Sequence, residues 1–320
     1  MEGPGAHRVA DELARFAGQR VEAVGGTADQ PLDRLEGRTV DGVRAVKKRV
    51  YLDTGDHHVV VHFLMYGSYR VNESRHLEER LELVCESDTL TVYSCSVKVL
   101  ADGDPNLEAY DRPEEDVLSP QFDREAALAA LAEREDPLVD VLLDQSEFGG
   151  VGNRIKNEVL WQQGRHPETP AAELSPDARE SLVDAAVRWT RAWYEHKRRG
   201  ESMPHEVYRH DTCSTCGGDI RKADLGATDR VTYWCPACQP RWVGQSPARS
   251  IADPSPPGRP PAVVPWPPSG CSGGWRLSTR PSGTPSTMPF HSSISISMRM
   301  FCKAGWSKKI RSVVGRTLRT

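Results

Sequence analysis

Apolar and polar positions alternate, or form short apolar runs, over much of the first third of the chain. Between about residue 20 and residue 118 these segments are bounded by polar turns, a pattern typical of antiparallel strands. The predicted strand segments are residues 38–53, 57–71, 81–87 and 89–99. Ahead of them, Val9, Leu13 and Phe16 share one face at helical spacing. The pattern therefore predicts one helix followed by an antiparallel β domain.

The apolar spacing becomes helical after a polar, proline-containing stretch at residues 102–120, which we interpret as a linker. An Ala- and Leu-rich helix follows, with Asp123 as its N-cap. A longer helix is predicted from Ser175, another suitable N-cap, to Arg199, with Gly200 beyond its end. This part of the chain is therefore expected to be helical.

A glycine-rich motif at residues 144–161 lies between these two helices. A first helix is predicted to end at Gln145, and a tight turn follows because glycine adopts positive φ without steric cost. The turn glycines are Gly149, Gly150 and Gly152. Asn153 is predicted to cap a second helix, whose free backbone N–H groups would offer a phosphate site. An ordinary helical hairpin without a ligand is the alternative.

Two CxxC pairs predict a metal site. Cys213 and Cys216 form the first pair, Cys235 and Cys238 form the second, and 18 residues separate the pairs. Four thiolates at turn spacing suit a tetrahedral Zn²⁺ ion. A redox-active pair is the alternative, but the presence of two such pairs argues against it. We therefore expect one structural zinc ion.

Charge is unevenly distributed along the 320 residues. Residues 1–241 contain 30 basic and 44 acidic side chains, whereas residues 242–320 contain 11 basic side chains and one acidic side chain. Phosphate contacts require Lys and Arg, so a nucleic-acid partner would need a local basic cleft in the acidic body. No signal peptide and no apolar run of membrane-spanning length is visible. These features predict a cytoplasmic protein without a membrane partner.

The stretch after Arg241 is rich in Pro, Ser, Gly and Arg and has no hydrophobic periodicity. Its two cysteines, Cys271 and Cys302, do not extend the CxxC pairs. Two interpretations stay open for residues 242–320: a disordered basic arm, or an out-of-frame or misassigned translation.

Three separated motifs resemble one known family. Glu2-Gly3-Pro4 opens the chain, the glycine motif lies in its middle, and Arg230 with a Thr-Tyr-Trp run precedes the second cysteine pair. Together these motifs are similar to those of the formamidopyrimidine-DNA glycosylase and endonuclease VIII family of DNA repair enzymes. The resemblance covers residues 1 to about 240 and includes the zinc motif.

The resemblance implies an α+β fold. Its expected parts are an N-terminal antiparallel β-sandwich with a helix, a helical domain with a helix–two-turn–helix, and a zinc β-hairpin. The low-complexity tail follows as a fourth segment. The corresponding boundaries are residues 1–118, 119–205, 206–241 and 242–320.

The resemblance also implies a bifunctional DNA glycosylase and AP lyase that removes oxidised bases, pyrimidines in preference to purines. In the family, an N-terminal proline amine attacks the sugar C1′ and a glutamate acts as acid/base. Here Met1 occupies the register of the proline and Glu2 that of the glutamate. The α-amine of Met1 is therefore the expected nucleophile, because primary amines also form Schiff bases. Lys48 matches the family's catalytic lysine.

Alternatives to this interpretation remain. Met1 could be merely the initiator, in which case the nucleophile is lost and the chain is a lesion- or abasic-site DNA-binding protein. Lys48 could lie in a solvated basic turn. A zinc-ribbon interaction module is a third possibility, against which the predicted β domain argues.

Five further residues are expected to contact DNA. Leu64, Met65 and Tyr66 match the family's intercalation loop, which fills the space left by a flipped-out nucleotide. A strand end packed in the core is the alternative for these three. Asn153 and Arg230 match residues that hold phosphates. The expected partner is double-stranded DNA with a damaged base or abasic site, bound by a nucleoid-associated monomer.

Overall fold

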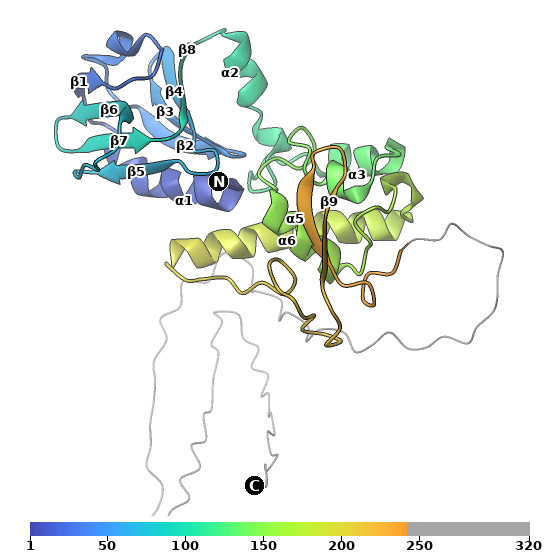
Figure 1. The fold of residues 1–320 in the computed structure, drawn as a ribbon. Coiled ribbons are helices and arrows are strands. Elements are labelled where there is room, and N and C mark those ends of the chain that lie inside the picture. Colours follow the sequence, from blue (N-terminus) through green and yellow to red (C-terminus); the bar gives the residue numbers. More distant parts are fainter. Residues whose placement is uncertain (242–320) are drawn as a thin grey trace, which may run out of the picture. The chain divides into compact units, whose positions relative to one another are not determined.

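The computed structural model describes residues 1–241, drawn in colour in Figure 1. The interpretations of residues 242–320, including those of Cys271 and Cys302, lie outside the described residues. None of the helices in the described part is both long and apolar enough to cross a membrane.

The chain begins with helix α1 (Gly3–Leu13), which continues into a short 3-10 turn, η1 (Ala14–Phe16). Val9, Leu13 and Phe16 are buried, as their helical spacing predicts. They join a core formed by residues of α1 and of both sheets that follow.

Eight antiparallel strands form two four-stranded sheets, with strand orders β1-β6-β7-β5 and β2-β3-β4-β8. Inward-facing residues such as Leu52 and Leu83 are fully buried in one shared core. The predicted antiparallel β-sandwich with a helix is therefore confirmed. The strands are β1 (Val21–Gly25), β2 (Gly42–Val46), β3 (Arg49–Thr54), β4 (His57–His62), β5 (Ser68–Val71), β6 (Glu79–Cys85), β7 (Thr89–Tyr93) and β8 (Ser96–Ala101), with a 3-10 turn η2 (Leu32–Leu35) between β1 and β2.

Three of the predicted strand segments each contain two strands. The chain turns at Lys47 between β2 and β3, at Leu64 between β4 and β5, and at Ser94 between β7 and β8. All three residues have positive φ, of 57°, 52° and 52°. The apolar pattern alone did not mark these turns, because none of the three residues is glycine and a change of sheet does not alter the pattern. The family resemblance, by contrast, implied the loop at residues 64–66.

The predicted linker at residues 102–120 contains a helix. Helix α2 (Pro105–Tyr110) is capped by Asp104, whose side chain accepts a 2.8 Å hydrogen bond from the Asn106 backbone N–H. Leu107 is buried in a small cluster on the outer side of β3 and β4. A 3-10 turn, η3 (Pro113–Glu115), follows. The predicted linker therefore carries one short helix, held by its N-cap and by one buried leucine.

The helical part is as expected except near the glycine motif. Asp123 and Ser175 cap α3 and α6 through the backbone N–H groups of Ala126 and Ala178. The first helix of the motif, however, ends at Val141 rather than Gln145. The elements are α3 (Arg124–Glu133), α4 (Leu138–Val141), α5 (Asn153–Gln162), η4 (Ala171–Glu173) and α6 (Pro176–Arg198). Their apolar residues form a second core.

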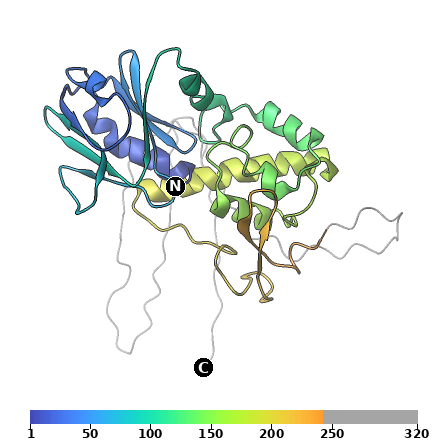
Figure 2. The ribbon, with the colours of Figure 1, turned by 45° about the horizontal axis from the view of Figure 1, so that its top comes forward.

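A two-stranded hairpin completes the described chain. β9 (Arg221–Leu225) pairs antiparallel with β10 (Arg230–Trp234), so that Leu225 faces Arg230 across the turn. β10 packs against α5, and Figure 2 shows the hairpin in orange beside the green helix.

Candidate active site and metal centre

The N-terminal segment is seated on the glycine turn that precedes α5. The Gly3 backbone N–H donates to the Gly150 carbonyl at 2.8 Å. The Glu2 carboxylate accepts from the Arg154 N–H at 3.0 Å and from the Ile155 N–H at 3.4 Å. The helix start that the sequence predicts as a free phosphate site is therefore occupied by Glu2, and that prediction is wrong.

Gly152 leaves the space that Glu2 fills. A Cβ atom added to Gly152 would lie 2.3 Å from Cγ of Glu2, far inside van der Waals contact. Gly152 is also the residue at the N-cap position of α5, with no side chain to cap the helix. The carboxylate of Glu2, distant in sequence, takes over this role and is held by the positive end of the helix dipole.

Asn153 is the first residue of α5 rather than its N-cap. Its side-chain Nδ2 donates to the Val231 carbonyl of β10 at 2.8 Å. Its Oδ1 atom is buried and has no hydrogen-bond partner among the described residues. The predicted capping role is wrong, because Glu2 supplies it, and Asn153 instead joins α5 to the hairpin.

The α-amine of Met1 lies beside the loop between β4 and β5, where it donates to the Leu64 carbonyl. The Met1 side chain packs against the β-sandwich core. Burial lowers the pKa of the amine below its ordinary value of 8.0. The charges of Lys48 and Lys197 lower this pKa further, whereas Glu2 opposes the shift.

Lys47 and Lys48 form the turn between β2 and β3 and have different surroundings. Lys47 is buried, and its ammonium pairs with Glu115 while its backbone N–H donates to Asp116 at 2.6 Å. Lys48 is half-buried, which excludes the alternative of a fully solvated turn. Burial lowers the pKa of Lys48 to about 8, against the opposing effect of Glu2.

Leu64, Met65 and Tyr66 project from the loop between β4 and β5. Their exposed fractions are 48%, 68% and 82%, the highest among the large hydrophobic side chains of the described residues. The alternative that they pack in the core is therefore wrong. Because Leu64 also accepts the bond from Met1, this apolar loop is adjacent to the amine.

Arg230 is exposed at the start of β10. Its positive charge lowers the pKa values of both Lys48 and Lys156, which places the guanidinium within electrostatic reach of the two lysines. The fold thus brings together an amine, a carboxylate, a lysine and an arginine from three separate segments. They belong to Met1, Glu2, Lys48 and Arg230.

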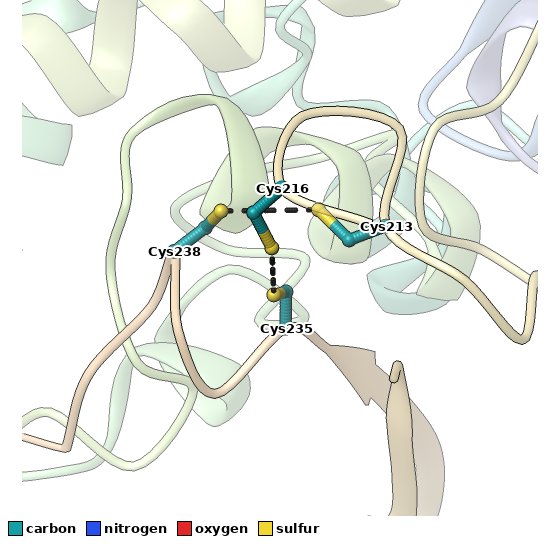
Figure 3. A group of neighbouring side chains, drawn as sticks. All are labelled: Cys213, Cys216, Cys235 and Cys238. Atoms are coloured by element: carbon teal, nitrogen blue, oxygen red, sulfur yellow. Dashed lines mark hydrogen bonds between the residues drawn. The ribbon is translucent and has the colours of Figure 1, made fainter. Parts of the chain in front are cut away.

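The four cysteines of the CxxC pairs converge beside the hairpin, as Figure 3 shows. Their Sγ atoms all lie within 4.8 Å of one another, with 3.8 Å between Cys213 and Cys238 and 3.4 Å between Cys216 and Cys235. A tetrahedral ion with bonds of about 2.3 Å to sulfur separates its ligands by about 3.8 Å. The four thiols can therefore hold a metal ion together.

Comparison with known proteins agrees with this arrangement. A family model described as the formamidopyrimidine-DNA glycosylase H2TH domain matches residues 114–199. Endonuclease 8-like 2 of Bos taurus is 34% identical over 203 residues, which is 58% of this chain and 60% of the relative. Endonuclease 8-like 3 of Xenopus laevis is 28% identical over 251 residues, 75% of this chain and 41% of the relative.

A solved structure has the same fold. The formamidopyrimidine-DNA glycosylase of Lactococcus lactis, non-covalently bound to DNA containing an AP site, matches with a TM-score of 0.66 and 22% identity. The match covers 75% of this chain and 100% of that chain. The chain is thus similar to the formamidopyrimidine-DNA glycosylase and endonuclease VIII family in sequence, over the H2TH domain and beyond it, and in fold. It spans about 60% of the length of the bovine relative.

Two features of this chain were not predicted from its sequence. Three successive polar residues of α5, Lys156, Asn157 and Glu158, are fully buried. The available signal was a polar run placed between the apolar residues Ile155 and Val159. Asp116 is also buried and accepts hydrogen bonds from His7 of α1 and from the Lys47 backbone. Nothing in the polar stretch around Asp116 distinguishes it from a surface carboxylate.

Proposed function

We propose that this chain is a DNA glycosylase with AP lyase activity that acts in base-excision repair. The observation that carries the proposal is the convergence of the Met1 amine, the Glu2 carboxylate and the Lys48 ammonium. The proteins similar to this chain include endonuclease 8-like proteins and a glycosylase bound to AP-site DNA, which supports the same activity and partner for this chain.

The lowered pKa of Met1 favours the chemistry, because only a neutral amine has a lone pair for attack. The nitrogen attacks the sugar C1′, the bond from C1′ to the base breaks, and the base departs with the bonding pair and takes up a proton. Glu2 donates a proton to the ring oxygen as the sugar opens, and the amine loses one, which leaves a protonated Schiff base.

Strand cleavage follows from the Schiff base. Loss of a C2′ proton expels the 3′-phosphate by β-elimination, and water then hydrolyses the imine and regenerates the amine. Lys48, near Glu2, would hold a phosphate of the damaged nucleotide. Because the pKa of Lys48 lies near 8, a bound phosphate would favour its charged form.

DNA binding is proposed to use the exposed loop and the hairpin. Leu64, Met65 and Tyr66 would enter the space vacated by the flipped nucleotide, where apolar side chains offset the cost of unstacking. Arg230 can donate to a phosphate directly through its guanidinium. Asn153 already uses its Nδ2 donor on Val231, and its Oδ1 atom, unpartnered among the described residues, only accepts, so its amide must first turn or bind phosphate through water.

The metal is proposed to be one structural zinc ion bound by the four cysteines. A site with four thiolates has no open position for substrate, so the ion would stabilise the hairpin and take no part in the reaction. We also propose that the protein acts as a monomer and prefers oxidised pyrimidines. The substrate preference rests on the resemblance of residues 2–4 and 64–66 to the endonuclease VIII branch, and paired duplexes carrying an oxidised pyrimidine or an oxidised purine would test it.

A second function is supported by the state of the amine. Met1 stands where relatives carry proline, and its amine is engaged by the Leu64 carbonyl. If that bond persists when DNA binds, the chain would recognise lesions or abasic sites without cutting them.

Borohydride trapping on an abasic duplex separates these functions. The lyase predicts a covalent adduct whose peptide map locates the bond at the N-terminal residue, after mass spectrometry has shown that Met1 is free. The binding function predicts a stable complex and no adduct. Undiminished trapping after selective acetylation of the N-terminus would reassign the nucleophile to a lysine, with Lys48 as the first candidate.

A further inference from the structure

Helix α5 carries a buried polar run that none of the proposed catalytic steps requires. Lys156, Asn157 and Glu158 are consecutive and fully buried. Successive helical residues point about 100° apart, so this run covers more than half of the helix circumference. The apolar residues Ile155 and Val159 fill the remaining face toward the helical core. Burying three polar side chains is unfavourable unless each has a partner.

Each of the three has its partner outside the helical core. Glu158 accepts from the backbone N–H groups of residues 206, 207 and 208, at 2.9, 3.1 and 2.9 Å. Asn157 accepts from the Tyr233 backbone N–H at 3.1 Å. Lys156 donates from Nζ to the hydroxyl of Thr232 at 2.7 Å. The run therefore connects α5 to the hairpin and to the segment that leads into it.

The Thr232 hydroxyl links Lys156 to Arg230. Thr232 is fully buried, and its hydroxyl donates in turn to the Arg230 carbonyl at 2.9 Å. Lys156, Thr232 and Arg230 thus form a chain of two hydrogen bonds that ends on the backbone of the arginine. On the other side of Arg230, both carboxylate oxygens of Asp140 accept from the Ala227 N–H at 2.9 Å. The arginine lies between these two anchors.

We propose that Lys156 is a positioning residue that acts through Thr232 to hold Arg230 against the DNA backbone. This inference rests on the proposed function, since it concerns the phosphate contact of Arg230. One hydrogen bond does not offset the free-energy cost of removing a buried ammonium from water. Burial and, to a smaller extent, the charge of Arg230 lower the pKa of Lys156 to about 7, against the opposing effects of Asp140 and Glu2, so the charged lysine carries a free-energy cost in the folded state.

Thermodynamic cycles on DNA affinity test the inference. Lys156→Met keeps the length of the side chain but removes the donor, and Thr232→Val removes the relay with little change of shape. Each is measured alone and combined with Arg230→Ala, on zinc-loaded protein, by binding to an abasic-analogue duplex at several salt concentrations. Lys98→Met is the matched control, because Lys98 also donates to a hydroxyl, that of Tyr110 at 3.0 Å.

The expected result is non-additivity. Arg230→Ala should weaken binding by about tenfold or more, as for a charge-assisted contact, and reduce the salt slope by about one. Lys156→Met and Thr232→Val should each weaken binding in the wild-type background and have no further effect in the Arg230→Ala background. Lys98→Met should leave affinity unchanged in both.

Three outcomes count against the inference or its basis. If Lys156→Met weakens binding equally with and without Arg230, the lysine does not act through the arginine and the inference is wrong. If Thr232→Val leaves affinity unchanged, the Thr232 hydroxyl does not position Arg230 and the inference is wrong. This result decides the matter even if Lys156→Met does not fold. If Arg230→Ala itself has no effect, the proposed phosphate contact fails, a result distinct from the other two.

Discussion

The amines of Met1 and Lys48 share one electrostatic environment. Each is partly buried, and the positive charge of Lys48 lowers the pKa of the Met1 amine while Glu2 raises both values. Partial burial makes the charged form of each amine unfavourable in the folded state. At the residue scale, reactivity and stability therefore depend on the same three groups.

Removal of Lys48 should stabilise the protein near neutral pH. The pKa of Lys48 is about 8 in the folded state and 10.5 ordinarily, so between these values the unfolded chain binds more protons and stability rises with pH. Below pH 8 the full penalty applies. Lys48→Met should therefore unfold at higher denaturant concentration than wild type at pH 7, with a smaller difference at pH 10. An equal difference at both pH values would contradict the proposed burial penalty.

The pH profile of borohydride trapping should reveal the same coupling. Attack requires the neutral amine, so the trapping rate should fall as the pH drops through the lowered pKa of Met1, below 8.0. Lys48→Met removes a charge that lowers this pKa, and the midpoint of the profile should move to higher pH. Single-turnover rates between pH 5.5 and 9 measure the shift. A midpoint that moves to lower pH, or stays fixed, would show that the two amines do not interact.

Helix α5 is the element that unites the site. Its first turn receives the Glu2 carboxylate, Asn153 and Lys156 contact β10, and Glu158 binds the segment before the cysteines. A change in the position of α5 would therefore displace the acid/base candidate and the hairpin together.

Gly152→Ala should remove Glu2 from its seat. The added Cβ would lie 2.3 Å from Cγ of Glu2, while the backbone of Gly152, with φ −124° and ψ −171°, suits alanine. We expect excision to slow by about 10²–10⁴-fold, the range for loss of a general acid/base, with little change in melting temperature. Gly42→Ala, where nothing lies within 4 Å, is the control. Equal excision rates for the two variants would mean that Glu2 is not held by this turn.

How far sequence could predict the elements depends on where their contacts lie. The caps Asp123 and Ser175 were predictable because each binds a backbone N–H three residues ahead. The cap of α5 was not, because Glu2 lies 152 residues before the N–H group that it accepts from. The cysteine cluster was predictable from spacing, whereas the burial of Lys156 depends on a hairpin residue 76 positions away.

At the scale of the whole molecule, the described chain has two large hydrophobic cores joined by polar contacts. One core belongs to the β-sandwich and the other to the helices. Between them lie the bonds of Glu2 and Gly3 to the glycine motif, and those of His7 and Lys47 to Asp116 and its neighbour. The two-core arrangement follows from the change in apolar periodicity, but the polar contacts between the cores have no signature in sequence.

Loss of the metal should affect only one part of the molecule. Cys213→Ser or Cys238→Ser leaves three thiolates, too few to satisfy a structural tetrahedral site. We expect loss of bound zinc and of DNA affinity, with the β-sandwich still folded because its core contains none of these cysteines. Metal analysis and hydrogen exchange resolved by segment measure the two effects. Purified wild-type protein without bound metal would refute the zinc assignment, and loss of protection in β1–β8 would refute the independence of the sandwich.

The contacts of α5 with β10 also determine how these positions can change in evolution. Asn157 binds the backbone of residue 233, and a backbone N–H is present whichever side chain follows it. Selection on this contact therefore constrains position 157 and leaves position 233 free to vary. Lys156 binds a side chain, so this contact depends on the residue types at both positions. A relative without a hydroxyl at position 232 would lose the partner of the lysine. Among related sequences, positions 156 and 232 should accordingly change together, and positions 157 and 233 should not.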